Sequence, residues 1–358
     1  MPEMDKYFFS KFARKAQRLR YPRRLVNYVV SEVARRLKLS FAPALPSRID
    51  IEPINTCNLK CPHCQVTYWN KEPRSLDQAR FESILRQLPH LMTIKLQGMG
   101  EPFLNRDLME MIRAGERRGI AMHLFTNGTV MGPGLAEQIA HLQRTHLCVS
   151  IDGATAQTHD NIRVGSSLPR IVAAIHDLVA RRGPSRQPVI TMYSVLTQAN
   201  IHEAAGLVQL AHSLGVDGIT LQTVLTGWGK KEIDQRNESL RLSEQGPELA
   251  DALRAAQKEA QSSGVTLEVS TEDRYTRTHP CPWPWTSAYI TAGGDVVPCC
   301  ILADSETMRM GNVFSSDFRT IWNSRQYRSL REQIRKHDLP ACCRGCYGNK
   351  PAHHEGDR

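Results

Sequence analysis

Apolar residues between Ile49 and Thr226 alternate between short runs and the wider spacing of amphipathic helices. The short runs predict strands at residues 49–54, 92–97, 120–125, 145–151, 189–196 and 217–223. Apolar positions three and four residues apart predict helices at residues 76–88, 106–118, 133–143, 168–182 and 202–214. Strands and helices that alternate in this order imply a parallel sheet with right-handed crossovers. We therefore expect an α/β fold.

Flanking segments complete the predicted organisation. The predicted parts are a basic N-terminal helical extension (1–48), the α/β core (49–229), a linker with an additional helix and strand (230–270), a small C-terminal domain (271–348) and a disordered tail (349–358). Pro22 is expected to interrupt helix formation in the extension. Residues 230–245 are polar and are expected to be the linker itself. In the C-terminal domain, Gly-Gly-Asp between β-prone runs predicts a hairpin, followed by a helix at about 317–336.

Composition narrows the class of protein. The 358 residues are 41% apolar and 23% charged, as in soluble globular proteins, and no apolar run approaches the roughly 18 residues of a membrane span. Ten cysteines occur mostly in close groups, at 57/61/64, 299/300 and 342/343/346, without a secretory signal. Grouped thiols of this kind favour metal ligation in a reducing compartment over disulfides, so we expect a cytoplasmic protein.

Positive charge is concentrated near the N-terminus. Residues 1–38 contain eleven Lys or Arg and three acidic residues, a net charge of +8 out of a total of +10. The rest of the chain is close to neutral, which argues against a nucleic-acid partner. The basic segment also contains apolar residues at partly helical spacing. We expect it either to contact an anionic membrane or an acidic partner, or to pack on the core with its basic face in solvent.

The sequence Cys57-Asn-Leu-Lys-Cys61-Pro-His-Cys64 directly follows the first predicted strand. Three thiols on one loop can converge on one metal centre, whereas a helix would spread them around its axis. A structural zinc site needs a fourth nearby ligand, and His63 is confined between two of the cysteines. A 4Fe–4S cluster takes one ligand per iron, so three thiolates leave one iron open. A zinc loop or buried free thiols are the alternatives.

This stretch closely resembles the Cys-x3-Cys-x-aromatic-Cys motif of the radical S-adenosylmethionine (SAM) enzymes, with His63 at the aromatic position. The resemblance implies a 4Fe–4S cluster on Cys57, Cys61 and Cys64 whose open iron chelates SAM. It also implies that SAM is cleaved to a 5′-deoxyadenosyl radical, which removes a hydrogen atom from a substrate. The core fold of this family is a partial (β/α)6 barrel, similar to a TIM barrel. Functional groups are then expected at the C-terminal ends of the strands.

Loops after the second and third strands carry further motifs. Gly98-Met-Gly100-Glu101-Pro102 resembles the family motif whose backbone and carboxylate hold the SAM amino group. Such glycines let backbone approach a ligand closely, and a carboxylate accepts hydrogen bonds from an ammonium group. Asn127 follows the third strand in Phe-Thr-Asn-Gly. It is expected on the cofactor side, although a turn explains Asn-Gly almost as well.

The fourth strand and the loop after it contain Ser150, Asp152 and Arg163, in a pattern that resembles the family branch with auxiliary clusters. There the serine and the arginine contact the SAM carboxylate and ribose. Arg suits a carboxylate because its guanidinium donates paired, charge-assisted hydrogen bonds. Asp152, grouped with the cofactor-binding residues, either contacts substrate or braces the loop. Cys148 is expected to be a buried spare thiol on the same strand face as Ser150.

A second cysteine group lies in the C-terminal domain. A hairpin would bring the thiols on either side of it together, and the following helix returns the chain to a Cys-x2-Cys turn. The spacing resembles the SPASM domain, in the shorter "twitch" form with one auxiliary 4Fe–4S cluster, because no cysteine follows Cys346. The expected ligands are Cys281, Cys299, Cys343 and Cys346. Cys300 and Cys342 are neighbours whose register could be exchanged, and a zinc ribbon fits the same spacing.

An auxiliary cluster with four protein ligands has no iron free for substrate, so we expect it to pass electrons. The leading prediction is a radical SAM oxidoreductase acting on a small molecule, such as a sugar, a cyclitol, or a cell-envelope or secondary-metabolite intermediate. A flavodoxin- or ferredoxin-type protein would donate electrons. A peptide-modifying maturase is the alternative, disfavoured because about 48 residues precede the first strand, too few for a folded leader-binding domain. A non-enzymatic iron–sulfur or zinc protein is the second alternative, and no catalytic base is identifiable.

Overall fold

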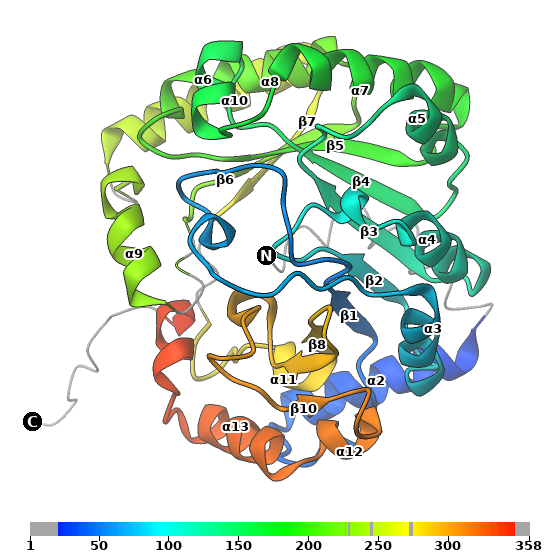
Figure 1. Cartoon of the computed structure of the whole chain (residues 1–358). Coiled ribbons are helices and arrows are strands. Elements are labelled where there is room, and N and C mark those ends of the chain that lie inside the picture. Colours follow the sequence, from blue (N-terminus) through cyan, green and yellow to red (C-terminus); the bar gives the residue numbers. More distant parts are fainter. Residues whose placement is uncertain (1–20, 226, 228–229, 244–245, 272–274, 348–358) are drawn as a thin grey trace, which may run out of the picture.

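The computed structural model describes residues 21–225, 227, 230–243, 246–271 and 275–347. One sheet of ten strands forms its centre, in the order β10-β9-β8-β1-β2-β3-β4-β5-β6-β7. All neighbouring strands from β8 to β7 pair in parallel, and β9 and β10 are antiparallel. Figure 1 shows the sheet curved into an open barrel, with helices around its outside. The predicted α/β partial barrel is confirmed.

The elements have the following bounds. The strands are β1 (Arg48–Ile51), β2 (Thr93–Leu96), β3 (Ala121–Thr126), β4 (Thr145–Ser150), β5 (Val189–Val195), β6 (Gly218–Gln222), β7 (Thr266–Ser270), β8 (Ser287–Ile290), β9 (Asp295–Val297) and β10 (Gly311–Asn312). The α-helices are α2 (Pro22–Arg36), α3 (Gln78–Gln87), α4 (Leu108–Arg117), α5 (Pro133–Ala140), α6 (Ala156–Ile162), α7 (Leu168–Arg182), α8 (Ala204–Ser213), α9 (Lys231–Asn237), α10 (Pro247–Ser263), α11 (Trp283–Thr286), α12 (Phe318–Trp322) and α13 (Arg325–Lys336).

Side chains along the barrel strands alternate between two environments. Ile49 and Ile51 of β1, like Leu96 of β2, belong to the apolar core that packs under the surrounding helices. The intervening positions point to the other face of the sheet, because a strand has a side-chain period of two residues. These positions are polar and buried, and they lie in register across four neighbouring strands: Asp50, Lys95, His123 and His146.

Several elements differ from the sequence-based expectation. Helix α9 lies within residues 230–245, which were expected to be a polar linker, and α6 was not predicted. The helix expected at 317–336 is two helices, because Ser324 accepts a hydrogen bond from Tyr327 N and begins α13. Pro22 starts helix α2 instead of interrupting one, since proline suits the first helical turn. Residues 1–20 and the tail expected at 349–358 lie outside the described residues.

The chain between α2 and β1 is held by side chains from the C-terminal region. Trp285 Nε1 donates to Leu39 O at 2.8 Å. The guanidinium of Arg331 is fully buried and donates to the carbonyl oxygens of Pro284 at 2.7 Å and Ser40 at 3.2 Å. Burial lowers its pKa to about 10. Arg331 therefore links the two ends of the described chain through neutral backbone groups. No helix in the described ranges is long and apolar enough to cross a membrane.

Replacing Arg331 with Met is expected to lower the free energy of unfolding by about 3 kcal/mol, because several buried carbonyl oxygens lose their donor. Chemical denaturation followed by circular dichroism measures this change. Arg335→Met on the exposed side of the same helix is the matched control and is expected to leave the denaturation midpoint unchanged. Equal destabilisation by both substitutions would contradict this account of Arg331.

Candidate active site

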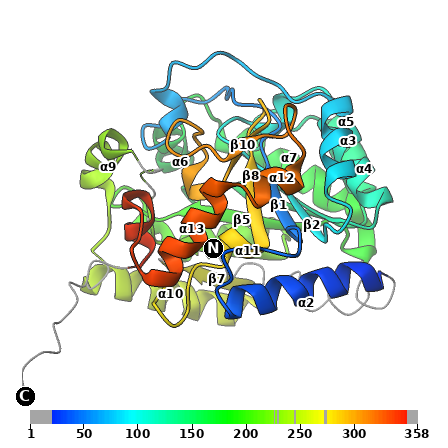
Figure 2. The same ribbon diagram turned by 90° about the horizontal axis from the view of Figure 1, so that it is seen from below.

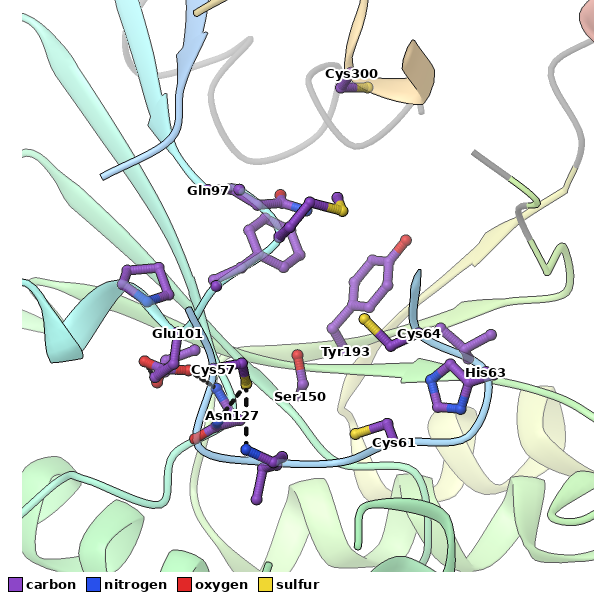
Figure 3. Close-up of a pocket in the computed structure, with 18 of the residues that line it drawn as sticks. Cys57, Cys61, His63, Cys64, Gln97, Glu101, Asn127, Ser150, Tyr193 and Cys300 are labelled. Atoms are coloured by element: carbon purple, nitrogen blue, oxygen red, sulfur yellow. Dashed lines mark hydrogen bonds between the residues drawn. The ribbon is translucent and has the colours of Figure 1, made fainter. Parts of the chain in front are cut away.

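One cavity lies at the C-terminal ends of the barrel strands, where the sequence predicted the functional groups. It is lined by almost all the predicted cofactor residues together with the first three cysteines: Cys57, Cys61, His63, Cys64, Gly98, Gly100, Glu101, Asn127, Ser150 and Arg163. Asp152 does not line it. Figure 3 shows the labelled side chains around this space. Motifs that are separated by more than one hundred residues are therefore brought together because parallel strands end at one edge.

The first three cysteines surround one part of the cavity. In Figure 3 the sulfur atoms of Cys57, Cys61 and Cys64 border a common space. Burial raises the pKa of all three thiols, that of Cys61 to about 12, while the guanidinium of Arg163 acts in the opposite direction. Cys57 Sγ accepts hydrogen bonds from Leu59 N at 3.4 Å and from Asn127 Nδ2 at 3.7 Å. The protein thus supplies donors that favour a thiolate.

These thiols fit a 4Fe–4S cluster with one open iron, since three soft sulfur donors converge on a partly apolar space. Across the described ranges, no three His, Cys, Asp or Glu side chains are close enough together to hold a single metal ion. Ligands of a 4Fe–4S cluster bind different iron atoms and do not need to share one.

The glycine turn after β2 is required by packing against the protein itself. A Cβ atom at Gly100 would overlap the carbonyl oxygens of Ile54 and Thr56, and one at Gly98 would overlap the Glu52 side chain. Close approach to a ligand was the expected reason for these glycines. The structure shows instead that they let the turn lie against the loop that carries the cysteines. The turn and that loop therefore hold each other in place.

Glu101 joins this turn to the end of β3. Its buried carboxylate accepts hydrogen bonds from Thr126 Oγ1 at 2.7 Å, Asn127 N at 2.7 Å and Phe103 N at 3.1 Å. Burial raises its pKa, and these hydrogen bonds oppose the increase. The side chain of Asn127 in turn donates to Asn58 Oδ1 at 3.0 Å. Asn127 therefore lines the cavity and also connects the third strand to the cysteine loop.

Asp152 supports Arg163 from behind the cavity wall. It is fully buried, and its Oδ2 accepts a hydrogen bond from Arg163 Nε at 2.7 Å, while its Oδ1 accepts one from Val195 N at 2.8 Å. Burial opposes the charge on Arg163, but Asp152 and the neighbouring thiols raise its pKa above the usual value. Of the two roles that the sequence left open for Asp152, the structure supports bracing of the loop.

Two helices that the sequence analysis did not predict, α6 and α9, also border the site. In α6, His159 accepts a hydrogen bond from Asp152 N at 3.2 Å. In α9, Asn237 donates to His63 O at 3.3 Å. Just before α9, Lys230 pairs with Asp304, a buried carboxylate that also pairs with Lys71. The polar composition of 230–245 gave no indication of this helix, because the helix is held by contacts with loops that are distant in sequence.

The far side of the cavity consists mainly of residues that no motif marked. Tyr193 donates to Gln222 Oε1, and both residues line the cavity. Tyr289, Cys300 and Asp50 also line the cavity. An inward-facing position on a barrel strand was the available signal for Tyr193 and Asp50.

The second cysteine group comes together as the spacing predicted. Burial raises the pKa of Cys281 and Cys299, and each is raised further by the other expected ligands: Cys346 acts on both, and Cys281 also acts on Cys299. Cys343 interacts with Cys281 and Cys299 as well. Tyr347 Oη accepts a hydrogen bond from Cys281 N at 2.9 Å.

The two thiols adjacent to expected ligands, Cys300 and Cys342, lie in different surroundings. Cys300 lines the cavity at the barrel mouth. Cys342 interacts with Cys343, and this hydrogen bond lowers the pKa of Cys342 to about 7. Cys148 is buried in the barrel interior beside Phe125 and Tyr193, where it was expected.

Comparison with known proteins assigns both cysteine regions. Residues 51–211 match the model of the radical SAM superfamily, and residues 281–347 match that of the SPASM iron–sulfur cluster-binding domain. A PqqA peptide cyclase of Xanthomonas axonopodis pv. citri is 27% identical over 86% of this chain and 82% of its own length. An AdoMet-dependent heme synthase of Methanosarcina barkeri is 26% identical over 77% of this chain and 82% of its own length.

Among solved structures, Streptococcus suis SuiB bound to the precursor peptide SuiA has a TM-score of 0.66, with 16% identity over 93% of this chain and 80% of that chain. SuiB bound to S-adenosylmethionine has a TM-score of 0.65 with 18% identity. At these identities the likeness concerns the fold. The barrel, the thiols at its mouth and both family matches agree, and the chain belongs to the radical SAM superfamily as an iron–sulfur enzyme with a C-terminal SPASM domain.

Proposed function

We propose that this enzyme uses a 5′-deoxyadenosyl radical to modify a peptide. The observation that carries the proposal is the match to PqqA peptide cyclases over 84–86% of the chain. The sequence alone favoured a small-molecule substrate because few residues precede β1. That argument concerned a leader-binding domain, and it has no bearing on the cavity in which a substrate reacts. The similarity to a heme synthase supports a small molecule as the second candidate.

Different residues of the cavity would hold the cluster and SAM. Cys57, Cys61 and Cys64 would hold the 4Fe–4S cluster, which, when bound, supplies the electron that cleaves SAM. The backbone of the glycine turn would accept from the SAM amino group. Ser150 and Arg163 would bind its carboxylate and ribose, since a buried guanidinium with a free edge favours an anionic group.

Asp152 has a positioning role in this proposal. It accepts a hydrogen bond from Nε of Arg163, which itself lines the cavity. Glu101 is held by three protein donors and so fixes the turn on which the SAM amino group would rest. His63 lies in the cavity wall, and burial lowers its pKa, so it stays neutral near the cluster.

Cys281, Cys299, Cys343 and Cys346 would hold one auxiliary 4Fe–4S cluster. With four thiolates it has no iron open for substrate, so its contribution is electron transfer. A flavodoxin- or ferredoxin-type protein is the proposed external donor.

The peptide proposal is tested by co-expressing the enzyme with each short peptide encoded beside its gene and measuring the peptide by mass spectrometry. One peptide is expected to change in mass or in retention time, and 5′-deoxyadenosine is expected to form on reduction. The triple variant Cys57→Ala/Cys61→Ala/Cys64→Ala should abolish both and lower the iron content from about eight to about four per chain. Turnover of a purified small molecule while all such peptides stay unmodified would refute the proposal.

Asp152→Asn is expected to weaken SAM binding by about tenfold or more, equal to about 1.4 kcal/mol, because Arg163 loses its buried anionic partner. Equilibrium dialysis with the reconstituted enzyme measures the affinity. Asp177→Asn, in an exposed ion pair on α7, is the control and should leave the affinity unchanged. Unchanged SAM binding in Asp152→Asn would show that Arg163 does not need this support.

Helix α2 supports a further partner proposal, peripheral contact with an anionic membrane surface through residues 1–38. Its outer face exposes an apolar stripe in which Val26 is 62% exposed, Val29 49%, Val33 47% and Leu37 64%. Figure 2 shows α2 along the outer edge of the molecule. Exposed Arg23 and Arg36 adjoin the stripe, within a segment of net charge +8. Apolar residues beside cations are the combination that an anionic lipid surface binds.

The enzyme is therefore expected to sediment with vesicles of phosphatidylglycerol and phosphatidylcholine, and much less with phosphatidylcholine alone. Val29→Glu/Val33→Glu should reduce binding by roughly tenfold or more, since each change replaces an apolar contact with a repelled charge. Ala250→Glu/Ala255→Glu adds the same charge on the exposed face of α10 and should have little effect. Equal loss in both double variants, or equal binding to both vesicle types, would contradict the proposal.

A further inference from the structure

Cys300 lies beside a proposed cluster ligand in sequence but belongs to the active-site cavity in space. It lines the same cavity as Cys57, Cys61 and Cys64. In the view of Figure 3 it lies on the opposite side of this space from the three cysteines, with Gln97 and Tyr193 between. A substrate in the cavity would thus have the radical-forming side on one face and the thiol of Cys300 on the other.

A buried cation lies behind this wall of the cavity. Lys95 is 2% exposed. The ammonium sits 4.1 Å from the ring centroid of Phe125 and interacts electrostatically with Asp50 and Cys300. All three of these residues line the cavity.

Gln97, two residues further along the same strand face, has a buried Oε1 without a partner among the described residues. This end of the cavity therefore combines a thiol with a nearby buried lysine and one unpaired amide oxygen. An unpaired acceptor beside a buried lysine suits an amide-containing substrate, whose N–H donates and whose carbonyl oxygen lies next to the carbon that reacts. The thiol of Cys300 thus belongs to a group of side chains that could bind or react with a substrate.

We propose that Cys300 is the hydrogen-atom donor of this cavity and returns a hydrogen atom to a carbon radical formed in it. The proposal rests on the proposed radical function and deepens it. The S–H bond of Cys300 breaks, a C–H bond forms on the substrate, and a thiyl radical remains on Sγ. One electron from the flavodoxin- or ferredoxin-type donor and one proton from solvent return the thiyl radical to the thiol.

This step decides the class of net reaction. The substrate loses one hydrogen atom to the 5′-deoxyadenosyl radical and regains one from Cys300, so its composition is unchanged. The second electron and the proton restore the thiol, and the first electron is consumed in cleaving SAM. One hydrogen atom is removed on one side of the cavity and the other is delivered from the opposite side. The expected outcome is therefore inversion at a carbon next to a carbonyl, such as a peptide Cα.

The test uses the full-length reconstituted enzyme with SAM alone as the probe, in D2O, under a flavodoxin reducing system. A thiol exchanges its hydrogen with solvent and a C–H bond does not. The 5′-deoxyadenosyl radical formed in the empty cavity is therefore expected to take deuterium from Cys300. Mass spectrometry should find most of the 5′-deoxyadenosine singly deuterated. Cys300→Ser should lower that fraction at least tenfold, because an O–H bond is too strong to donate to a carbon radical.

Two further measurements separate donation from ligation. Cys300→Ser should keep the iron content and the electron paramagnetic resonance spectrum of the reduced wild type, and iodoacetamide should alkylate Cys300 in the reconstituted protein. Cys342→Ser is the matched control and should keep the deuterium fraction. Loss of iron in Cys300→Ser, an undeuterated wild-type product, or the same deuterium fraction in Cys300→Ser would overturn the proposal. Failure of the wild type to form any 5′-deoxyadenosine would instead overturn the radical function itself.

Discussion

The parallel hydrogen bonding of β8 to β1 is the contact on which the active site depends. It joins residues 287–290 to residues 48–51, so that the C-terminal region continues the barrel sheet. The loop that carries the first three cysteines leaves β1, and the hairpin that leads to Cys299 and Cys300 leaves β8. Both cysteine groups are therefore placed by adjacent strands of one sheet, and the wall that carries Cys300 closes one side of the cavity.

Polar groups in this barrel are organised by strand alternation. The apolar side chains of each strand pack under the helices and form the main core. The inward positions can therefore be polar. Asp50, Lys95, His123 and His146 occupy these positions in one layer. Burial lowers the pKa of both histidines, that of His146 to about 4, so they are neutral near pH 7. The layer thus concentrates its charge on Asp50 and Lys95, next to the cavity.

The residues of the site are held by other protein groups in addition to any cofactor. Glu101 links the glycine turn to β3, Asp152 links Arg163 to β5, and Asn237 links α9 to the cysteine loop. Breaking a buried charged contact is costly, since the remaining partner stays desolvated. These contacts therefore maintain the geometry of the cavity. They also explain why Glu101, which was expected to bind the cofactor, has structural partners.

The sequence by itself determined the alternation of strands and helices, the cysteine loop and the motifs at the strand ends, because each of these depends on residues close together in the chain. It did not reveal β8 on β1, whose partners are more than two hundred residues apart, or α9, whose contacts are with distant loops. Nor could it separate Cys299 from Cys300. Cys299 has an extended backbone, with φ −159° and ψ 166°, so adjacent side chains point in opposite directions. Only the tertiary structure places Cys299 where it interacts with Cys281 and Cys346 and places Cys300 in the wall of the cavity.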